Sequence, residues 1–163
     1  MLSQAFPTGH PRAGQPTNFL TAFNNAKMCV KCDKKALGLC TRGVAGYLKK
    51  HTIRGNYDLW ASRFEKIDDG KACLSIRVWS GTPYRSKQVE IARLTREDGI
   101  GLQRLTFDFD ELNSPRIDGA ALKPSAKDLA HNDGLSYEDW NGWFNGHDLS
   151  KPMAVIHLTK YRY

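Results

Sequence analysis

The sequence has no long hydrophobic run, no internal repeat and no low-complexity tract. A membrane-spanning helix needs roughly 20 consecutive apolar residues, so the sequence predicts no such helix. Residues 1–14 show no charged start followed by an apolar stretch, and we therefore expect no secretion signal. The chain has 163 residues, of which 40% are hydrophobic and 25% charged. This composition is typical of a folded globular protein and excludes a disordered one. The sequence thus predicts a single cytoplasmic domain over residues 1–163, with no membrane partner.

The positive charge of the sequence is concentrated in its first third. The formal net charge is +7, and residues 1–50 alone hold eight Lys and Arg residues against one acid, which also gives +7. A basic end of this kind favours a polyanionic partner such as RNA. The alternative is a lysine-rich face that is solvated and has no partner.

Hydrophobic periodicity predicts a mixture of short helices and strands. Helices are expected over residues 18–28, 44–50 and 56–69, and after the capping pair Ser136 and Asp139. Strands are expected over residues 72–80, 88–94, 101–109 and 153–159. The order does not repeat as βαβαβ, so the sequence predicts an α+β fold with a mostly antiparallel sheet that is curved or closed. Large aromatic side chains are expected in its core: Trp60, Phe64, Trp79, Trp140, Trp143 and Phe144.

The densest polar cluster lies at a predicted helix-to-strand junction, in residues 49–54 (Lys-Lys-His-Thr-Ile-Arg). Side chains alternate along a strand, so Lys50, Thr52 and Arg54 share one face, and Lys49 joins them if the chain turns before the strand begins. Lysine supplies a point charge, and arginine supplies a planar fork suited to phosphate or a base edge. A buried lysine with a lowered pKa also acts as a base toward a hydroxyl such as that of Thr52. The cluster predicts a ligand pocket; the alternative is an ordinary strand beside solvated lysines.

Two motifs in this sequence resemble those of the ASCH family. The Lys-x-x-Thr-Ile-Arg pattern at residues 49–54 resembles the ligand-pocket signature of that family. Residues 132–136 (Asn-Asp-Gly-Leu-Ser), directly before the aromatic segment 140–144, are similar to a second ASCH motif. ASCH domains are close relatives of the PUA fold, so the resemblance implies a PUA-like, curved, mostly antiparallel β-barrel flanked by short helices. The domain would carry a Cys/Lys-rich insert at about residues 29–42.

The resemblance also implies a function. PUA-like domains commonly bind RNA, and we therefore expect an RNA- or nucleotide-binding domain with a basic pocket around Lys49, Thr52, Arg54 and Asp133. The bacterial acetylcytidine amidohydrolases, which this chain resembles in part, deacylate a modified cytidine nucleoside with the same motif and a distant carboxylate. By that resemblance Lys49 is the base, Thr52 the nucleophile and Asp133 the carboxylate of a catalytic triad. The carboxylate here is Asp where that branch has Glu, and the insert at residues 29–42 has no counterpart there, so binding ranks first and hydrolysis second.

A second candidate site is the loop at residues 80–87, which joins two predicted strands. It presents Tyr84 together with Arg85 and Lys87. An aromatic ring that stacks on a base, beside cations that contact phosphate, is the usual combination for binding a single strand of nucleic acid. The alternative is a hairpin with a solvated tip.

The cysteines allow a zinc site but do not require one. Cys29-x-x-Cys32 and Cys40 would supply three thiolates, and the first spacing suits a tetrahedral site. Only one such pair is present where zinc ribbons have two, so an insert with reduced thiols and no cofactor is the alternative. The fourth ligand would come from one of three residues: His10, His51 or Cys73.

The remaining histidines and the C-terminal segment receive no role from the sequence. His131, His147 and His157 are isolated, and residues 160–163 are expected to fray. A domain that contacts another protein of the nucleic-acid machinery is a third functional class, and the oligomeric state is not predicted.

Overall fold

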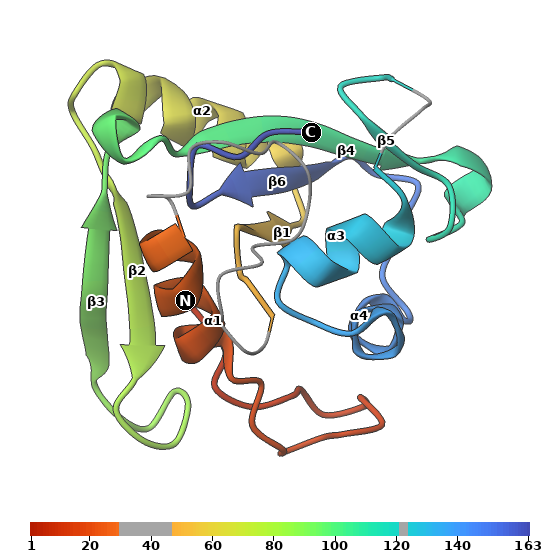
Figure 1. Cartoon of the computed structure of the whole chain (residues 1–163), viewed down its shortest axis with the longest axis horizontal. Helices are drawn as coiled ribbons and strands as arrows, with labels where there is room; N and C mark the ends of the chain where they lie inside the picture. The colour runs from red at the N-terminus through yellow and green to blue at the C-terminus, as the bar shows by residue number, and fades with distance from the viewer. Residues whose placement is uncertain (30–46, 121–123) are drawn as a thin grey trace.

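The computed structural model describes residues 1–29, 47–120 and 124–163. Figure 1 shows an α+β fold in which short helices surround two antiparallel sheets. The predicted α+β class is therefore confirmed. Within the described residues the strands form two separate sheets that do not close into a barrel. No described helix is long and apolar enough to cross a membrane.

The larger sheet has four strands in the order β1-β6-β4-β5. These are β1 (His51–Arg54), β6 (Met153–His157), β4 (Gly101–Phe107) and β5 (Pro115–Ile117). All five residues of β6 are buried, because this strand is central and is covered on both faces. The pairing of β1 with β6 places His51 opposite His157 and Thr52 opposite Ile156.

The smaller sheet is a ribbon of two strands, β2 (Leu74–Trp79) and β3 (Gln88–Leu94), and β3 has the bounds that the sequence predicted. Side chains alternate along β2, so that Ile76 and Val78 are buried and Arg77 is exposed. The backbone N–H of Leu2 donates to the carbonyl of Arg77 at 2.8 Å. The N-terminal segment thus lies along β2.

In the part of the chain that the structure describes, four α-helices pack around the sheets, and capping side chains mark the starts of three of them. They are α1 (Phe19–Cys29), α2 (Tyr57–Asp68), α3 (Ala126–Asn132) and α4 (Tyr137–Phe144), with two 3-10 turns, η1 (Arg96–Asp98) and η2 (Asp108–Asp110). The Asn56 side chain accepts the N–H of Leu59 at the start of α2, and Ser136 accepts that of Asp139 in α4. The α2 helix packs on β4 and β6, and α3 packs on α4.

The predicted helix over residues 44–50 is wrong where the structure describes it, at residues 47–50. These residues are extended because their backbone bonds to other segments. The N–H of Lys49 donates to the carbonyl of Ala22 at 3.0 Å, and that of Lys50 donates to the carbonyl of Asn132 at 2.8 Å. Tertiary hydrogen bonds therefore replace the bonds that a helix would form with itself.

One hydrophobic core joins both sheets and the helices. Trp140, Phe64 and Phe144 are buried in it, as predicted, whereas Trp60 and Trp143 are partly buried against it. Trp79 lies at the end of β2 on the exposed face of the ribbon and is only partly covered.

Candidate functional site

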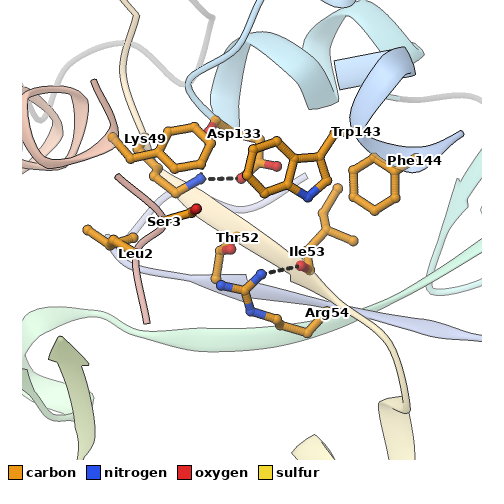
Figure 2. Close-up of a pocket in the computed structure, with 10 residues that line it drawn as sticks. Leu2, Ser3, Lys49, Thr52, Ile53, Arg54, Asp133, Trp143 and Phe144 are labelled. Atoms are coloured by element: carbon orange, nitrogen blue, oxygen red, sulfur yellow. Dashed lines mark hydrogen bonds and ion pairs between the residues drawn. The ribbon is translucent and has the colours of Figure 1, made fainter. Parts of the chain in front are cut away.

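A buried ion pair joins Lys49 to Asp133, which lie 84 positions apart in the sequence. The Nζ atom of Lys49 lies 2.6 Å from Oδ1 of Asp133 and 2.7 Å from its carbonyl oxygen. The two side chains are only 2% and 8% exposed. Figure 2 shows the pair among the residues that line a pocket beside β1.

The local backbone explains why the motif at residues 132–136 places Asp133 there. Asp133 ends α3, and Gly134 then adopts a left-handed conformation with φ of 83°. A Cβ atom at residue 134 would lie 3.3 Å from that of Lys49 and 3.4 Å from that of Ala22. Both the φ angle and the close approach of Lys49 favour glycine, and this turn directs the Asp133 carboxylate toward the ammonium group.

Burial moves the pKa values of the two partners toward each other. Loss of solvation lowers the pKa of Lys49, although the adjacent Asp133 carboxylate acts against that change. Loss of solvation raises the pKa of Asp133, and the Lys49 ammonium opposes it. The ammonium also lies 3.7 Å from the centre of the Phe19 ring, a cation–π contact. Burial therefore brings the charged and the neutral form of this pair closer in free energy than they are in water.

Thr52 and Arg54 lie on the pocket side of β1, next to the ion pair (Figure 2). Within the described residues the Thr52 hydroxyl makes no hydrogen bond to another group. Arg54 donates to the carbonyl of Met1 at 2.8 Å and to that of Ile53 at 3.3 Å. Burial lowers the pKa of Arg54, with the Asp133 carboxylate opposing, and the guanidinium keeps its charge.

The pocket is small and has one polar and one largely apolar side. Its empty space is about 310 Å³ when the open mouth is included. The polar side consists of Lys49, Thr52, Arg54 and Asp133. The other lining residues come from the N-terminal segment, β1 and two helices: Leu2, Ser3, Phe19, Ile53, Trp143 and Phe144. The arrangement suits a small planar ligand with polar edges.

Lys50 does not line this pocket, although the sequence placed it on the face of Thr52 and Arg54. It precedes β1, and its ammonium lies 4.7 Å from the centre of the Tyr161 ring. Its carbonyl accepts the N–H of Leu158 at 2.8 Å. The alternation expected for a strand fails at this residue because the strand begins one position later.

The loop residues Tyr84, Arg85 and Lys87 lie between β2 and β3 and are absent from the pocket lining. They form a separate surface, and Tyr84 is 90% exposed. The structure therefore brings together four of the predicted site residues and leaves this loop as a second candidate region.

The zinc prediction falls largely outside the described residues. Cys32, Cys40 and the side chain of Cys29 are not described, so the site stays a prediction. Of the proposed fourth ligands, His10 uses both ring nitrogens in bonds to the carbonyl of Asp139 and the N–H of Arg12. In residues 1–29, 47–120 and 124–163 no group of three or more His, Cys, Asp and Glu side chains is placed to hold a metal ion.

Sequence reasoning missed a buried polar cluster on the opposite face of β1 from the pocket. The Tyr163 hydroxyl lies 3.3 Å from Nε2 of His51 and accepts a hydrogen bond from Asn132 at 3.0 Å. The rings of His51 and His157 are 6.0 Å apart, so His157 is not isolated. The prediction that residues 160–163 fray is wrong for Tyr163, which the cluster holds in place. The available signal was the histidine that ends the otherwise aliphatic segment of β6, Met-Ala-Val-Ile-His.

No protein-family model, curated protein or solved structure matches this chain. Membership of the ASCH family therefore stays a prediction from the two motifs.

Proposed function

We propose that the pocket binds a nucleotide, either free or within RNA, as expected of an ASCH-type domain with a PUA-like fold. The observation that carries the proposal is the buried Lys49–Asp133 pair beside the unbonded hydroxyl of Thr52 and the guanidinium of Arg54. Together these groups offer hydrogen-bond donors and acceptors to one ligand, and Trp143 offers an aromatic face. A nucleobase has complementary edges and a flat face.

The charge of the pocket supports a ligand with a neutral base and an anionic phosphate. Lys49 and Asp133 compensate each other, and Arg54 leaves one positive charge. Arg54 bonds to the Met1 carbonyl, a neutral acceptor that a phosphate oxygen would outcompete because it is charged. The net charge of +7 favours the approach of such a ligand.

Thr52→Val tests the binding proposal because it removes the hydroxyl and nearly preserves the shape. We expect the affinity for cytidine 5′-monophosphate to fall about fivefold to tenfold, the usual contribution of one neutral hydrogen bond. Isothermal titration calorimetry measures this change. The matched control is Thr106→Val, because Thr106 is also a partly buried strand residue and lies outside the pocket. Equal affinities of wild type and Thr52→Val would contradict the proposal.

Amide hydrolysis is the second candidate, and the lowered pKa of Lys49 favours it. In this reaction neutral Lys49 takes the proton of the Thr52 hydroxyl group. At the same time the Thr52 oxygen adds to the acyl carbon of the substrate. The carbon–nitrogen bond breaks, and the proton passes to the leaving amine. Water then hydrolyses the acyl-threonine ester, which releases the acid and restores Thr52. Within the described residues no hydrogen bond joins Lys49 to Thr52, and binding therefore ranks first.

An acetate-release assay with acetylated cytidine separates the two candidates. We expect the wild-type protein to bind this nucleoside without releasing acetate above the level of Thr52→Val. Release by the wild type that is at least tenfold faster than by Thr52→Val and by Lys49→Met would establish hydrolysis and assign both roles. Thr106→Val serves again as the control and should behave like the wild type.

A further inference from the structure

Tyr84 occupies an unusual position at the tip of the β2–β3 ribbon. Its side chain is 90% exposed, and its backbone has a φ of 64°, in the left-handed region that a bulky residue rarely adopts. Strained backbone of this kind persists where the surrounding structure enforces it, and it concentrates at functional sites. A glycine would adopt the same backbone conformation without strain. The presence of a tyrosine at this strained position therefore indicates that its exposed ring has a function.

Hydrogen bonds within the loop fix the backbone on both sides of Tyr84. The Ser86 hydroxyl accepts the N–H of Gly81 at 3.0 Å and donates to the carbonyl of Thr82 at 2.9 Å. The N–H of Arg85 also donates to the Thr82 carbonyl, at 3.2 Å. Tyr84 is therefore presented by an ordered loop, which reduces the entropy that a partner would have to remove on binding.

The partly buried Trp79 lies beside the exposed Tyr84 and forms an aromatic platform with it. The two ring centres are 5.3 Å apart and the ring planes are inclined at 51°. We call these two residues the Trp79–Tyr84 platform. The exposed Tyr84 ring, supported by the partly buried Trp79 ring at the end of the ribbon, offers a face on which a planar group can stack.

The surroundings of the platform are positively charged. Residues 74–94 hold four Arg and Lys residues against one Glu, which gives +3. Arg77 and Arg93 both pair with Glu90, at 3.8 and 3.1 Å. In the part of the chain that the structure describes, Arg85 and Lys87 form no salt bridge. They remain available to an anionic partner, and their charge disfavours a basic or purely apolar one.

The N-terminal residues connect the platform with the pocket. Leu2 and Ser3 line the pocket, and the N–H of Leu2 bonds to the carbonyl of Arg77 on β2. Trp79 lies two residues further along the same strand, roughly 7 Å away, on the same face as the Arg77 side chain. This distance is the length of strand between Arg77, to which Leu2 bonds, and Trp79, so one short stretch of β2 joins the pocket-lining N-terminal segment to the platform.

We propose that the Trp79–Tyr84 platform stacks a base of single-stranded RNA while a nearby nucleotide of the same strand enters the pocket. This inference rests on the proposed function and identifies the partner as an oligonucleotide instead of a free nucleoside. The exposed rings accept any base, and Arg85 and Lys87 contact the phosphates on either side of it. The platform supplies affinity, and the pocket selects the nucleotide.

The test compares a fluorescein-labelled RNA of about ten nucleotides, a length within the usual site sizes for single-stranded nucleic acid, with cytidine 5′-monophosphate. Tyr84→Gly removes the ring and accepts the left-handed backbone, so the variant is expected to fold. We expect its affinity for the RNA, measured by fluorescence anisotropy, to fall roughly tenfold, and its affinity for the mononucleotide to stay unchanged. Tyr84→Phe should retain RNA binding because the ring remains.

Phe109 provides a matched control, because it is 91% exposed and also has a positive φ, of 54°. Phe109→Gly should bind the RNA like the wild type. The double variant Arg85→Ala/Lys87→Ala should lower the slope of log affinity against log salt concentration by about 1.4, since each contact contributes about 0.7. Unchanged RNA affinity in Tyr84→Gly, or an equal loss in Phe109→Gly, would overturn the platform. A loss in Tyr84→Gly without any mononucleotide binding would retain the platform and reject the pocket.

Discussion

Asp133→Ala is expected to lower the free energy of unfolding by about 3 to 5 kcal/mol, because it leaves a charged ammonium buried without its partner. The Lys49 side chain is only 2% exposed, so solvent compensates little for the lost carboxylate. The carbonyl of residue 133, at 2.7 Å, remains as a weaker acceptor. Urea unfolding measures the change, with a constant m-value as evidence that only the folded state is affected. Nucleotide binding should be lost in the same variant.

A double variant separates the role of the pair in stability from its role in binding. Lys49→Met/Asp133→Leu removes both charges and fills a similar volume, so we expect a free energy of unfolding within about 1 kcal/mol of the wild type. Nucleotide binding should remain absent. The exposed pair of Lys71 and Asp69 is the control, and Lys71→Ala should change stability by less than about 1 kcal/mol. A double variant as unstable as Asp133→Ala would show that shape, not the unpaired charge, causes the loss.

Acidification from pH 7.5 to pH 5 is expected to destabilise the protein steeply through its buried histidines. Burial lowers the pKa of His51 well below 6.5 and that of His157 to about 3. Below pH 6.5 the unfolded chain therefore binds protons that the folded chain does not, and stability falls as the pH falls toward the folded pKa values. Each such histidine contributes a slope of about 1.4 kcal/mol per pH unit once it is protonated in the unfolded state.

His157→Gln isolates one of these contributions. We expect the slope of unfolding free energy against pH, obtained from urea titrations, to decrease by about 1.4 kcal/mol per pH unit below pH 6. The comparison of two slopes removes the contributions of other titrating groups and any constant loss of stability from the lost bond to Gln103. Identical slopes would mean that His157 is protonated in the folded protein as readily as in the unfolded one.

Much of the fold could be predicted because short-range patterns determine it. Alternation predicted the bounds of β3, and the capping pair at Ser136 predicted the start of α4. The α3 helix was missed although Ser125 and Asp128 form a capping box, because seven residues hold too few apolar positions to show a helical period. Residues 47–50 were predicted wrongly because their hydrogen bonds go to segments distant in sequence.

The convergence of Lys49, Thr52 and Arg54 on one pocket followed from their spacing and from a motif resemblance. The place of Asp133 in the same pocket came from the resemblance alone, since no spacing rule relates residues 84 positions apart. The aromatic side of the pocket was not predicted. Trp143 was expected in the core because packing and ligand contact require the same kind of side chain, and the sequence does not distinguish them.

The central position of β6 has a consequence for how the protein is made on the ribosome. The four-stranded sheet cannot assemble until this strand, which follows every other strand in the sequence, has left the exit tunnel. Until then β1 and β4 have no partner between them, and their edges stay open to other chains. Pairing β1 with β6 then closes a loop of about a hundred residues, so folding is expected to be slow for a chain of this size and to gain from chaperone protection during synthesis.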